Sequence, residues 1–232
     1  MPMSLKLFSG GAAQALVGEL ATRFKTETGL DIEGQFGAVG GMKAKLLEGE
    51  PADLLILSRA LIDELAVGGH VDPASVTDVG VVRTAVAVRQ GDAVPPIGDA
   101  GALRSALLAA DAIFFPDPRL ATAGIHFAKV LSALGIADEV AVALRTFPNG
   151  AAAMRALAAS ADARPIGCTQ ITEMLSIPGL TIVGFLPREF ELATIYTAGV
   201  ATRAEQPDAA RKLIAMLAAA EAADIRKKVG FG

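Results

Sequence analysis

Short apolar runs alternate with longer segments of helical periodicity along the first third of the chain. The short apolar runs at 5–8 and 53–57 predict strands, and so does the segment 31–36, in which Ile32, Gly34 and Phe36 alternate with polar residues. A segment of helical pattern follows each of them. The run at 53–57 is continuously apolar after its first residue, as in a strand that is buried on both faces of a parallel sheet. The order β-α-β-α-β-α predicts a parallel sheet that is covered by helices on both faces.

Two longer β-rich runs, at 80–89 and 192–201, bracket a second α/β segment in the middle of the chain. This arrangement predicts two α/β lobes joined by two crossing strands. The expected boundaries are 1–82 plus 198–232 for the first lobe, 83–197 for the second, and about 83–89 and 192–200 for the hinge strands. Ligands of open α/β sheets bind beyond the carboxyl ends of the strands, at helix N-termini, so a cleft between the lobes is the expected ligand site.

The amino-acid composition excludes several classes of protein for this chain. The chain has 232 residues, 52% of them hydrophobic, which excludes a disordered chain. The net charge of −4 argues against a general nucleic-acid partner, because such proteins need a basic surface. No stretch reaches the roughly 18 consecutive apolar residues of a membrane span, so we expect no membrane insertion.

The N-terminal residues and the cysteine count bear on the compartment. Cys168 is the single cysteine, so no intramolecular disulfide can form. Residues 1–8 lack the charged and apolar regions of a signal peptide, and strand-like sequence begins at Leu5. The chain as written is therefore expected in the cytoplasm, or in the periplasm if a leader has been removed.

The loops that follow the expected strands are rich in Gly, Ser, Thr, Asn and Gln. Such loops present backbone N–H groups at the positive end of a helix dipole and suit a phosphate, oxyanion or carboxylate. Each glycine taken alone is best explained as a turn residue, and it is the recurrence after successive strands that favours anion binding. The residues expected to hold the ligand are Ser9, Gly10, Gly11, Val39, Gly40, Gly41, Arg83, Thr122, Ala123, Gly124, Asn149, Gly150, Thr169 and Gln170.

Standard catalytic and cofactor motifs are absent. The sequence contains no phosphate-binding P-loop, dinucleotide fingerprint, nucleophile elbow or H-E-x-x-H, and we predict no cofactor and no metal site. Of the two histidines, His70 is expected on the surface, whereas His126 falls in the first turn of a helix beside the expected cleft. His126 is therefore the candidate catalytic base, and a helix-face residue packed on a strand is the alternative. Cys168 is interpreted as a small buried hydrophobic residue. Arg59 and Arg83 could each pair with a carboxylate of the ligand, and for each the alternative is an exposed arginine on a strand.

Several segments resemble the molybdate-binding solute-binding proteins of ABC transporters. The likeness covers most of the chain and is carried by the following segments: Phe8-Ser9-Gly10-Gly11, Thr28-Gly29-Leu30, Gln35-Phe36, Gly49-Glu50-Pro51-Ala52-Asp53-Leu54, Pro116-Asp117-Pro118, Ala123-Gly124-Ile125 and Val229-Gly230-Phe231. The resemblance implies the type II periplasmic-binding fold, in which two lobes close on a ligand.

The chain departs from that family where the family holds molybdate. The family uses serine hydroxyls in the first two loops and a tyrosine, whereas here Ser9 is kept, Val39 and Gly40 stand in the second loop, and Gln170 takes the tyrosine position. A lost hydroxyl leaves a buried acceptor unpaired at a cost of about 1–3 kcal/mol, so molybdate is not the expected ligand. The segments 123–131 and 167–173 are similar to a side branch of the family, the aconitate isomerases.

Two functions follow from these observations. The first is a binding protein for a small organic anion, a carboxylate or polycarboxylate, with an ABC permease as partner only if the chain is exported. The second is an isomerase of an unsaturated polycarboxylate such as aconitate, with His126 as base and Glu173 or Asp117 as alternatives if burial raises their pKa values. A cytoplasmic anion sensor is a third, weaker hypothesis.

Overall fold

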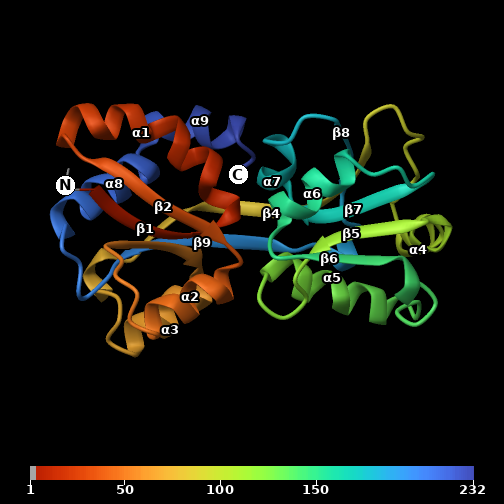
Figure 1. Cartoon of the computed structure of the whole chain (residues 1–232), viewed down its shortest axis with the longest axis horizontal. Helices are drawn as coiled ribbons and strands as arrows, with labels where there is room; N and C mark the ends of the chain where they lie inside the picture. Colours follow the sequence, from red (N-terminus) through yellow and green to blue (C-terminus); the bar gives the residue numbers. More distant parts are fainter. Residues whose placement is uncertain (1–3) are drawn as a thin grey trace. The chain divides into compact units, whose positions relative to one another are not determined.

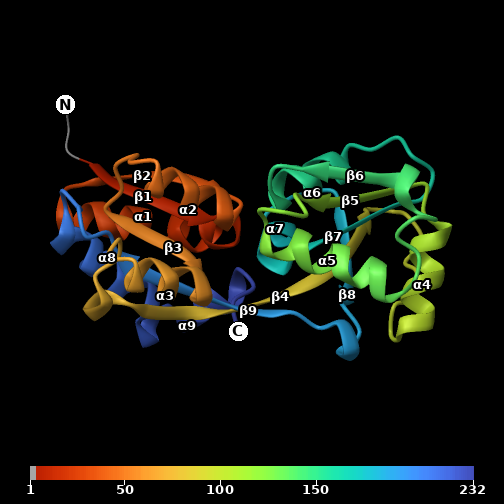
Figure 2. The same ribbon diagram turned by 90° about the horizontal axis from the view of Figure 1, so that it is seen from below.

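The computed structural model describes residues 4–232 and divides into two compact units. Unit 1 comprises the described residues up to Val82 together with Thr194–Gly232, and unit 2 comprises Arg83–Ala193. The chain passes from one unit to the other within strand β4 (Thr77–Arg89) and returns at the start of β9 (Ala193–Val200), as the colours in Figures 1 and 2 show.

Unit 1 is built on a mixed sheet with the strand order β2-β1-β3-β9-β4. The strands other than β4 and β9 are β1 (Ser4–Gly10), β2 (Asp31–Gly37) and β3 (Leu54–Ser58). Strand β1 pairs in parallel with β2 and β3, and β3 pairs antiparallel with β9. The parallel arrangement places the loops after β1, β2 and β3 at one edge of this sheet.

Helices cover both faces of the unit 1 sheet. They are η1 (Gly11–Ala13), α1 (Gln14–Thr28), α2 (Val39–Leu47), α3 (Arg59–Val67), η2 (Pro73–Ser75), α8 (Pro207–Ala218), η5 (Ala220–Ala222) and α9 (Ala223–Lys228). Figure 1 shows α1, α8 and α9 on one face, and α2 and α3 on the other. Helix α1 ends where Gly29 adopts a left-handed φ of 74°, a conformation that glycine takes without steric cost.

Unit 2 repeats the α/β design around the strand order β4-β7-β5-β6, with β8 paired to β4. Its other strands are β5 (Ala112–Pro116), β6 (Leu144–Phe147), β7 (Pro165–Gln170) and β8 (Leu180–Phe185). Strand β5 runs parallel to β6 and β7, whereas β4 is antiparallel to β7 and β8. The loops after β5, β6 and β7 therefore share one edge of this sheet.

The helices of unit 2 again lie on both faces. They are α4 (Ala100–Ala109), α5 (Thr122–Ala133), η3 (Ala141–Ala143), α6 (Gly150–Ala158), α7 (Ile171–Leu175) and η4 (Arg188–Phe190). Figure 1 shows α6 and α7 on the face of β5 and β7 opposite to α5. The parallel strands β5, β6 and β7 thus lead into α5, α6 and α7, which begin at the candidate loop edge of this sheet.

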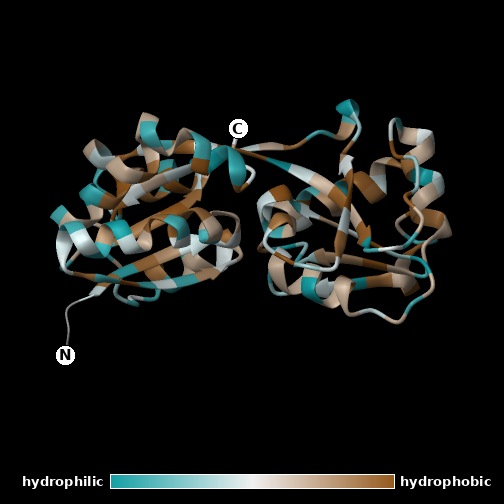
Figure 3. Ribbon diagram, turned by 90° about the horizontal axis from the view of Figure 1, so that it is seen from above, coloured by the Kyte–Doolittle hydropathy of each residue, from teal (hydrophilic) through white to brown (hydrophobic). Residues whose placement is uncertain are grey.

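The apolar periodicity of the sequence explains the core. The run Leu54–Leu57 of β3 is fully buried, as expected for a strand with helices on both faces. In unit 2, Phe115 and Phe127 pack edge to face with their ring centroids 5.3 Å apart, joining β5 to α5. Figure 3 shows hydrophobic colour along these inner strands and hydrophilic residues scattered over the helices.

The first turn of α2 differs from the sequence prediction. Val39, Gly40 and Gly41, which the sequence places in a glycine-rich loop, form the first turn of this helix. Glycine lowers helix propensity, so the sequence favours a loop there, while its backbone N–H groups still serve a helix N-terminus.

Candidate functional site

The loop after β1 carries the first expected binding residues. Ser9 and Gly10 end β1, and Gly11 opens η1. The Ser9 side chain is fully buried, and its hydroxyl donates to the Gly10 carbonyl over 2.9 Å. A methyl group at Gly10 would lie 2.8 Å from both the Tyr196 ring and the Val39 side chain, so only glycine fits there. The loop after β1 and the start of α2 are therefore neighbours within unit 1.

The start of α2 exposes the N–H groups of a helix that no side chain caps. Its N-cap residue is Ala38, and within residues 4–232 no side chain accepts a hydrogen bond at this cap. The first turn, Val39–Gly41, contains no acidic residue. Helices leave their first four N–H groups without intrahelical partners, so this turn can donate to an oxyanion.

Helix α5 of unit 2 begins in the same way. Its N-cap is Ala121, and within the described part of the chain no side-chain cap and no first-turn acid occur there. The Asp117 side chain accepts from the backbone N–H groups of Arg119, at 2.7 Å, and Leu120, and so stabilises the preceding turn rather than the helix. Gly124 lies against the carbonyl oxygens that precede that turn and leaves no room for a Cβ. The first turn Thr122–Gly124 thus offers free donors on a tightly fixed backbone.

Helix α6 begins differently, because side chains of this chain already satisfy its N-terminus. Asn149 is the N-cap, and its Oδ1 accepts from the Ala152 N–H over 2.8 Å. The Glu173 carboxylate accepts hydrogen bonds from the N–H groups of Gly150 and Ala151. A Cβ on Gly150 would collide with this carboxylate. The α6 N-terminus therefore binds an internal carboxylate.

Glu173 is buried and also accepts hydrogen bonds from the end of β7. The Thr169 hydroxyl donates to Glu173 Oε2 over 2.7 Å, and the Gln170 backbone N–H donates to the same carboxylate. Burial raises the pKa of Glu173, and these hydrogen bonds offset part of the increase. Asn149, Gly150 and Thr169, which the sequence predicts as ligand residues, are thus engaged in an internal network.

Both candidate arginines have carboxylate partners. Arg83 Nε lies 2.7 Å from Glu191 Oε1, and its guanidinium stacks 3.9 Å from the centroid of the Phe185 ring. Arg59 pairs with two carboxylates, those of Asp63 and Asp78, which raise the pKa of its guanidinium. Arg83 has one carboxylate partner in these contacts and Arg59 has two, so Arg83 is the better placed of the two for a second anion.

His126 lies on α5, and one of its ring nitrogens forms a hydrogen bond within the protein. Its Nε2 is 2.7 Å from the carbonyl oxygen of Phe190. Because a carbonyl only accepts, Nε2 carries the proton, and in the neutral ring Nδ1 holds the lone pair. Cys168 is buried, and desolvation raises the pKa of its thiol, so it is no nucleophile.

The structure adds three residues that the sequence did not single out. Tyr196 of β9, the only tyrosine of the chain, is buried beside Gly10. The hydroxyls of Thr84 and Thr172 are buried and have no hydrogen-bond partner among the described residues. Thr84 lies directly opposite Gln170 in the β4–β7 ladder. The sequence does show one hydroxyl inside an apolar strand and one at a helix start, which could have marked Thr84 and Thr172 as candidates. That these hydroxyls lack partners, however, depends on the tertiary structure.

The sequence profile of the bacterial extracellular solute-binding proteins matches residues 5–232. The chain belongs to this family. A helix both long and apolar enough to cross a membrane is not found in the part of the chain that the structure describes.

Similar proteins of known structure share the fold of this solute-binding chain. The periplasmic molybdate-binding protein of Azotobacter vinelandii is 18% identical, with a TM-score of 0.81 over 99% of both chains. The sulfate-binding protein SubI of Mycobacterium tuberculosis H37Rv is 16% identical, with a TM-score of 0.77 over 99% of this chain and 86% of that chain. These similarities show the type II periplasmic-binding fold that the sequence predicts.

One curated relative is an enzyme. The aconitate isomerase of a Pseudomonas species is 27% identical over 226 residues, which cover 95% of this chain and 84% of the relative. This match agrees with the likeness to the aconitate isomerase branch that the sequence analysis describes.

Proposed function

We propose that this solute-binding protein binds a small organic anion, a carboxylate or polycarboxylate, through the uncapped helix starts of its units. The observation that carries the proposal is the contrast between α5 and α6, which both begin at the loop edge of the unit 2 sheet. Helix α6 is capped by Asn149 and binds the Glu173 carboxylate, whereas α5 follows Ala121, which cannot cap it. A free N-terminus beside an occupied one at the same sheet edge favours an anion as the missing partner. Helix α2 of unit 1 follows Ala38 and likewise has no side-chain cap within the described residues, as do α1, α3, α7, α8 and α9.

The hydroxyls of unit 2 favour a ligand with several acceptor oxygens. Thr84 and Thr172 each have a buried hydroxyl without a hydrogen-bond partner among residues 4–232. A buried donor without a partner lowers the free energy of unfolding by about 1–3 kcal/mol. A carboxylate oxygen would satisfy such a donor. Arg83, with its partly exposed guanidinium, would add the positive charge that a polycarboxylate requires.

The same residues argue against molybdate. Val39 and Gly40 begin α2 where the molybdate-binding family carries serine hydroxyls, and Gln170 stands at the expected tyrosine position. Backbone N–H groups alone then face the ligand from the start of α2. Backbone N–H groups can bind a planar carboxylate as well as a tetrahedral oxyanion. Without the serine hydroxyls of the molybdate-binding family, the site loses its preference for the tetrahedral oxyanion.

Isothermal titration of the purified protein tests the proposal. We expect saturable binding of at least one of trans-aconitate, cis-aconitate, citrate and tricarballylate, with molybdate and sulfate at least tenfold weaker. The Arg83→Gln variant should lose affinity for polycarboxylates, and the control Arg59→Gln should not. Tight molybdate binding, or no binding of any carboxylate, would contradict the proposal.

A second candidate function is isomerisation of an unsaturated polycarboxylate, which the aconitate isomerase relative favours. In such a reaction a base removes a proton from the methylene carbon next to a carboxylate. The electron pair shifts through the double bond, and a proton is returned at the far carbon. We propose the Nδ1 atom of His126 as this base, because Nε2 is held by the Phe190 carbonyl and imidazole accepts protons near neutral pH.

Proton NMR of trans-aconitate with purified protein separates the two functions. The enzyme hypothesis predicts appearance of the cis isomer, and loss of at least 100-fold of the rate in His126→Ala, a magnitude typical of general acid–base catalysis. His70→Ala, on an exposed turn of unit 1, is the matched control and should keep full activity. Binding without turnover would leave the chain a binding protein, and an active His126→Ala variant would contradict the role of this base.

The location and the partner remain predictions. The family is described as extracellular, which favours the periplasm, and the cytoplasm is the alternative. We propose an ABC permease as partner only for an exported form. Fractionation of cells that carry the native locus, with detection of the protein in periplasm and cytoplasm, tests both expectations.

A further inference from the structure

One ion pair of unit 2 lies at the edge of the sheet from which the candidate loops extend. Thr84 of β4 pairs with Gln170, the last residue of β7, and the two strands are antiparallel. Arg83 therefore lies one residue beyond that end of β7. Phe185, whose ring stacks on the Arg83 guanidinium, is the last residue of β8 and pairs with Ala85. Both side chains thus belong to the edge at which α5, α6 and α7 begin.

Arg83 and Glu191 are in contact but share no hydrogen bond. Arg83 Nε lies 2.7 Å from Glu191 Oε1, yet Nε has no hydrogen-bond partner among the described residues, so its N–H bond does not point at this oxygen. The remaining N–H groups of Arg83 and the Glu191 carboxylate also form no hydrogen bond within residues 4–232. The two side chains are 40% and 35% exposed. Both therefore have hydrogen-bonding capacity that the protein itself does not use.

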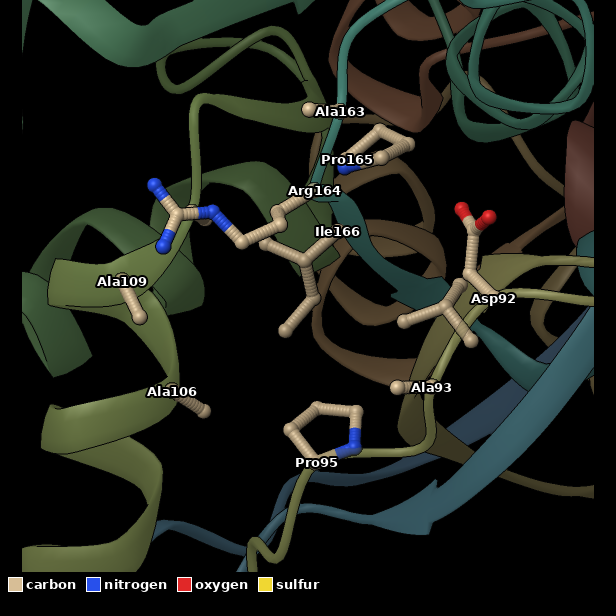
Figure 4. A pocket seen from close by; sticks show the side chains of 11 residues that line it. Asp92, Ala93, Pro95, Ala106, Ala109, Ala163, Arg164, Pro165 and Ile166 are labelled. Carbon is tan, nitrogen blue, oxygen red and sulfur yellow. The ribbon is translucent and has the colours of Figure 1, made fainter.

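The other arginine–carboxylate pairs among the described residues of unit 2 are hydrogen-bonded. They are Arg89–Asp92 at 2.9 Å, Arg104–Glu139 at 3.2 Å and Arg164–Asp111 at 2.8 Å. Figure 4 shows Asp92 and Arg164 in the wall of a cavity of about 230 Å³, beside the first residues of β7 and so at the end of the sheet opposite to the candidate loops. The pair without a hydrogen bond is therefore the one that lies at the ligand edge.

Phe185 limits the direction from which a ligand can reach Arg83. Its ring centroid lies 3.9 Å from the central carbon of the guanidinium, so the ring covers one face of this planar group. Nε is buried, so the exposed part of the side chain comprises the stem and the Nη groups. The N–H donors lie in the guanidinium plane, and an acceptor therefore binds along this plane at the Nη groups, with the Glu191 carboxylate beside it.

We propose that this pair recognises a 2-hydroxycarboxylate group of the bound anion. The ligand carboxylate accepts from the Nη groups of Arg83, and the neighbouring ligand hydroxyl donates to the Glu191 carboxylate. Such a group carries its acceptor and its donor on adjacent carbons, as the guanidinium and the carboxylate lie side by side here. Because Arg83 already neutralises Glu191, a neutral hydroxyl suffices as donor, whereas an ammonium group would lie against the guanidinium. The inference rests on the anion binding proposed above and names a ligand class within it.

Calorimetric titration of the full chain with matched ligands tests the proposal. Citrate and tricarballylate differ only in the hydroxyl group of citrate, and malate and succinate form a second such pair. We expect the hydroxylated member of each pair to bind about tenfold more tightly, the value of one hydrogen bond to a charged group. Equal affinities within the pairs, or tighter binding of tricarballylate and succinate, would overturn the inference and leave anion binding intact. No binding of any of the four would contradict the proposed function and the inference with it.

Variants of the pair locate the contact with the hydroxyl. Glu191→Leu removes the acceptor at similar volume and should bind citrate no more tightly than tricarballylate. Arg83→Gln removes the donors to the ligand carboxylate and should weaken the binding of both. Glu139→Leu removes the acid of the exposed Arg104 pair, which precedes β6 at the far end of the sheet, and should keep the tenfold preference for citrate. An undiminished preference in Glu191→Leu would overturn the inference, and if this variant does not fold, the comparison of ligands on the unaltered protein still decides it.

Discussion

The Thr169 hydroxyl and the Glu173 carboxylate lie 2.7 Å apart in the interior of unit 2, and together they hold the beginning of α6. The carboxylate also accepts the backbone N–H groups of Gly150, Ala151 and Gln170. A buried side chain thus takes the place at α6 that an external anion could otherwise occupy. This relationship divides the helix starts of the chain into those that are internally satisfied and those that are free.

Removal of the buried carboxylate should destabilise unit 2. In Glu173→Ala, the Thr169 hydroxyl and the three N–H groups lose their acceptor, and we expect the free energy of unfolding to fall by about 3 kcal/mol. Urea denaturation monitored by circular dichroism measures this change. Glu48→Ala, an exposed carboxylate in unit 1, should stay within about 0.5 kcal/mol of the parent protein. Equal stabilities of the two variants would show that the network contributes nothing.

The pH dependence of stability should carry the signature of Glu173. Burial raises its pKa above the ordinary value of 4.5, so between the two values the folded state binds more protons than the unfolded state. Stability from this group is therefore full below about pH 4.5 and is lost as pH rises through the folded pKa.

Glu173→Gln cannot titrate and isolates this contribution. We expect the free energy of unfolding of the parent protein, minus that of the variant, to decrease from pH 5 to pH 8, by at most about 1.4 kcal/mol per pH unit. Urea titrations at each pH give both values. A difference that is constant with pH, or that grows as pH rises, would contradict the raised pKa.

Asp53 performs a comparable internal task in unit 1. Its Oδ2 accepts from the Lys6 N–H at 2.8 Å, and its Oδ1 accepts from the N–H groups of Glu205 and Gln206 at the beginning of α8. We expect Asp53→Ala to lower the free energy of unfolding by about 3 kcal/mol, because three buried or half-buried donors lose their acceptor. Thermal unfolding compared with Asp63→Ala, whose side chain lies on the surface of α3, measures the effect. Equal losses in both variants would show that these hydrogen bonds are not important.

New caps on the free helix starts should compete with the ligand. Ala121→Asp introduces a carboxylate that can accept from the first turn of α5, and Ala38→Asp does so for α2. We expect each variant to stabilise the ligand-free protein by about 1 kcal/mol and to weaken carboxylate binding at least tenfold. Thermal shift and calorimetric titration report the two quantities.

The matched control changes a cap away from these helix starts. Asp99 caps α4 through the Ala102 N–H, and Asp99→Ala should lower the free energy of unfolding by about 1 kcal/mol without a change in affinity. If the Ala121→Asp and Ala38→Asp variants bind carboxylates as well as the parent protein, these N–H groups do not hold the ligand.

The order of strands and helices was largely accessible from the sequence. The apolar run in β3 and the helix Arg59–Val67 are local patterns, and the fold class that they predict is confirmed by the solute-binding relatives. The start of α2 was missed, because Gly40 and Gly41 look like a loop when helix propensity alone is considered.

By itself, the sequence determined the fold class, and it identified the glycine-rich segments at Ser9, Val39, Thr122 and Asn149 as strand-to-helix junctions. These properties depend on residues close together in the chain, where periodicity and turn chemistry operate. Only the tertiary structure decided which junctions remain free to donate. The sequence around Asn149 resembles that of the other junctions, but Glu173, which is distant in sequence, accepts the N–H groups of Gly150 and Ala151 at the start of α6. A hydrogen bond between segments that are far apart in the sequence leaves no local sequence pattern. Only the packing of the folded chain brings Glu173 to the start of α6 and so determines which helix starts are occupied.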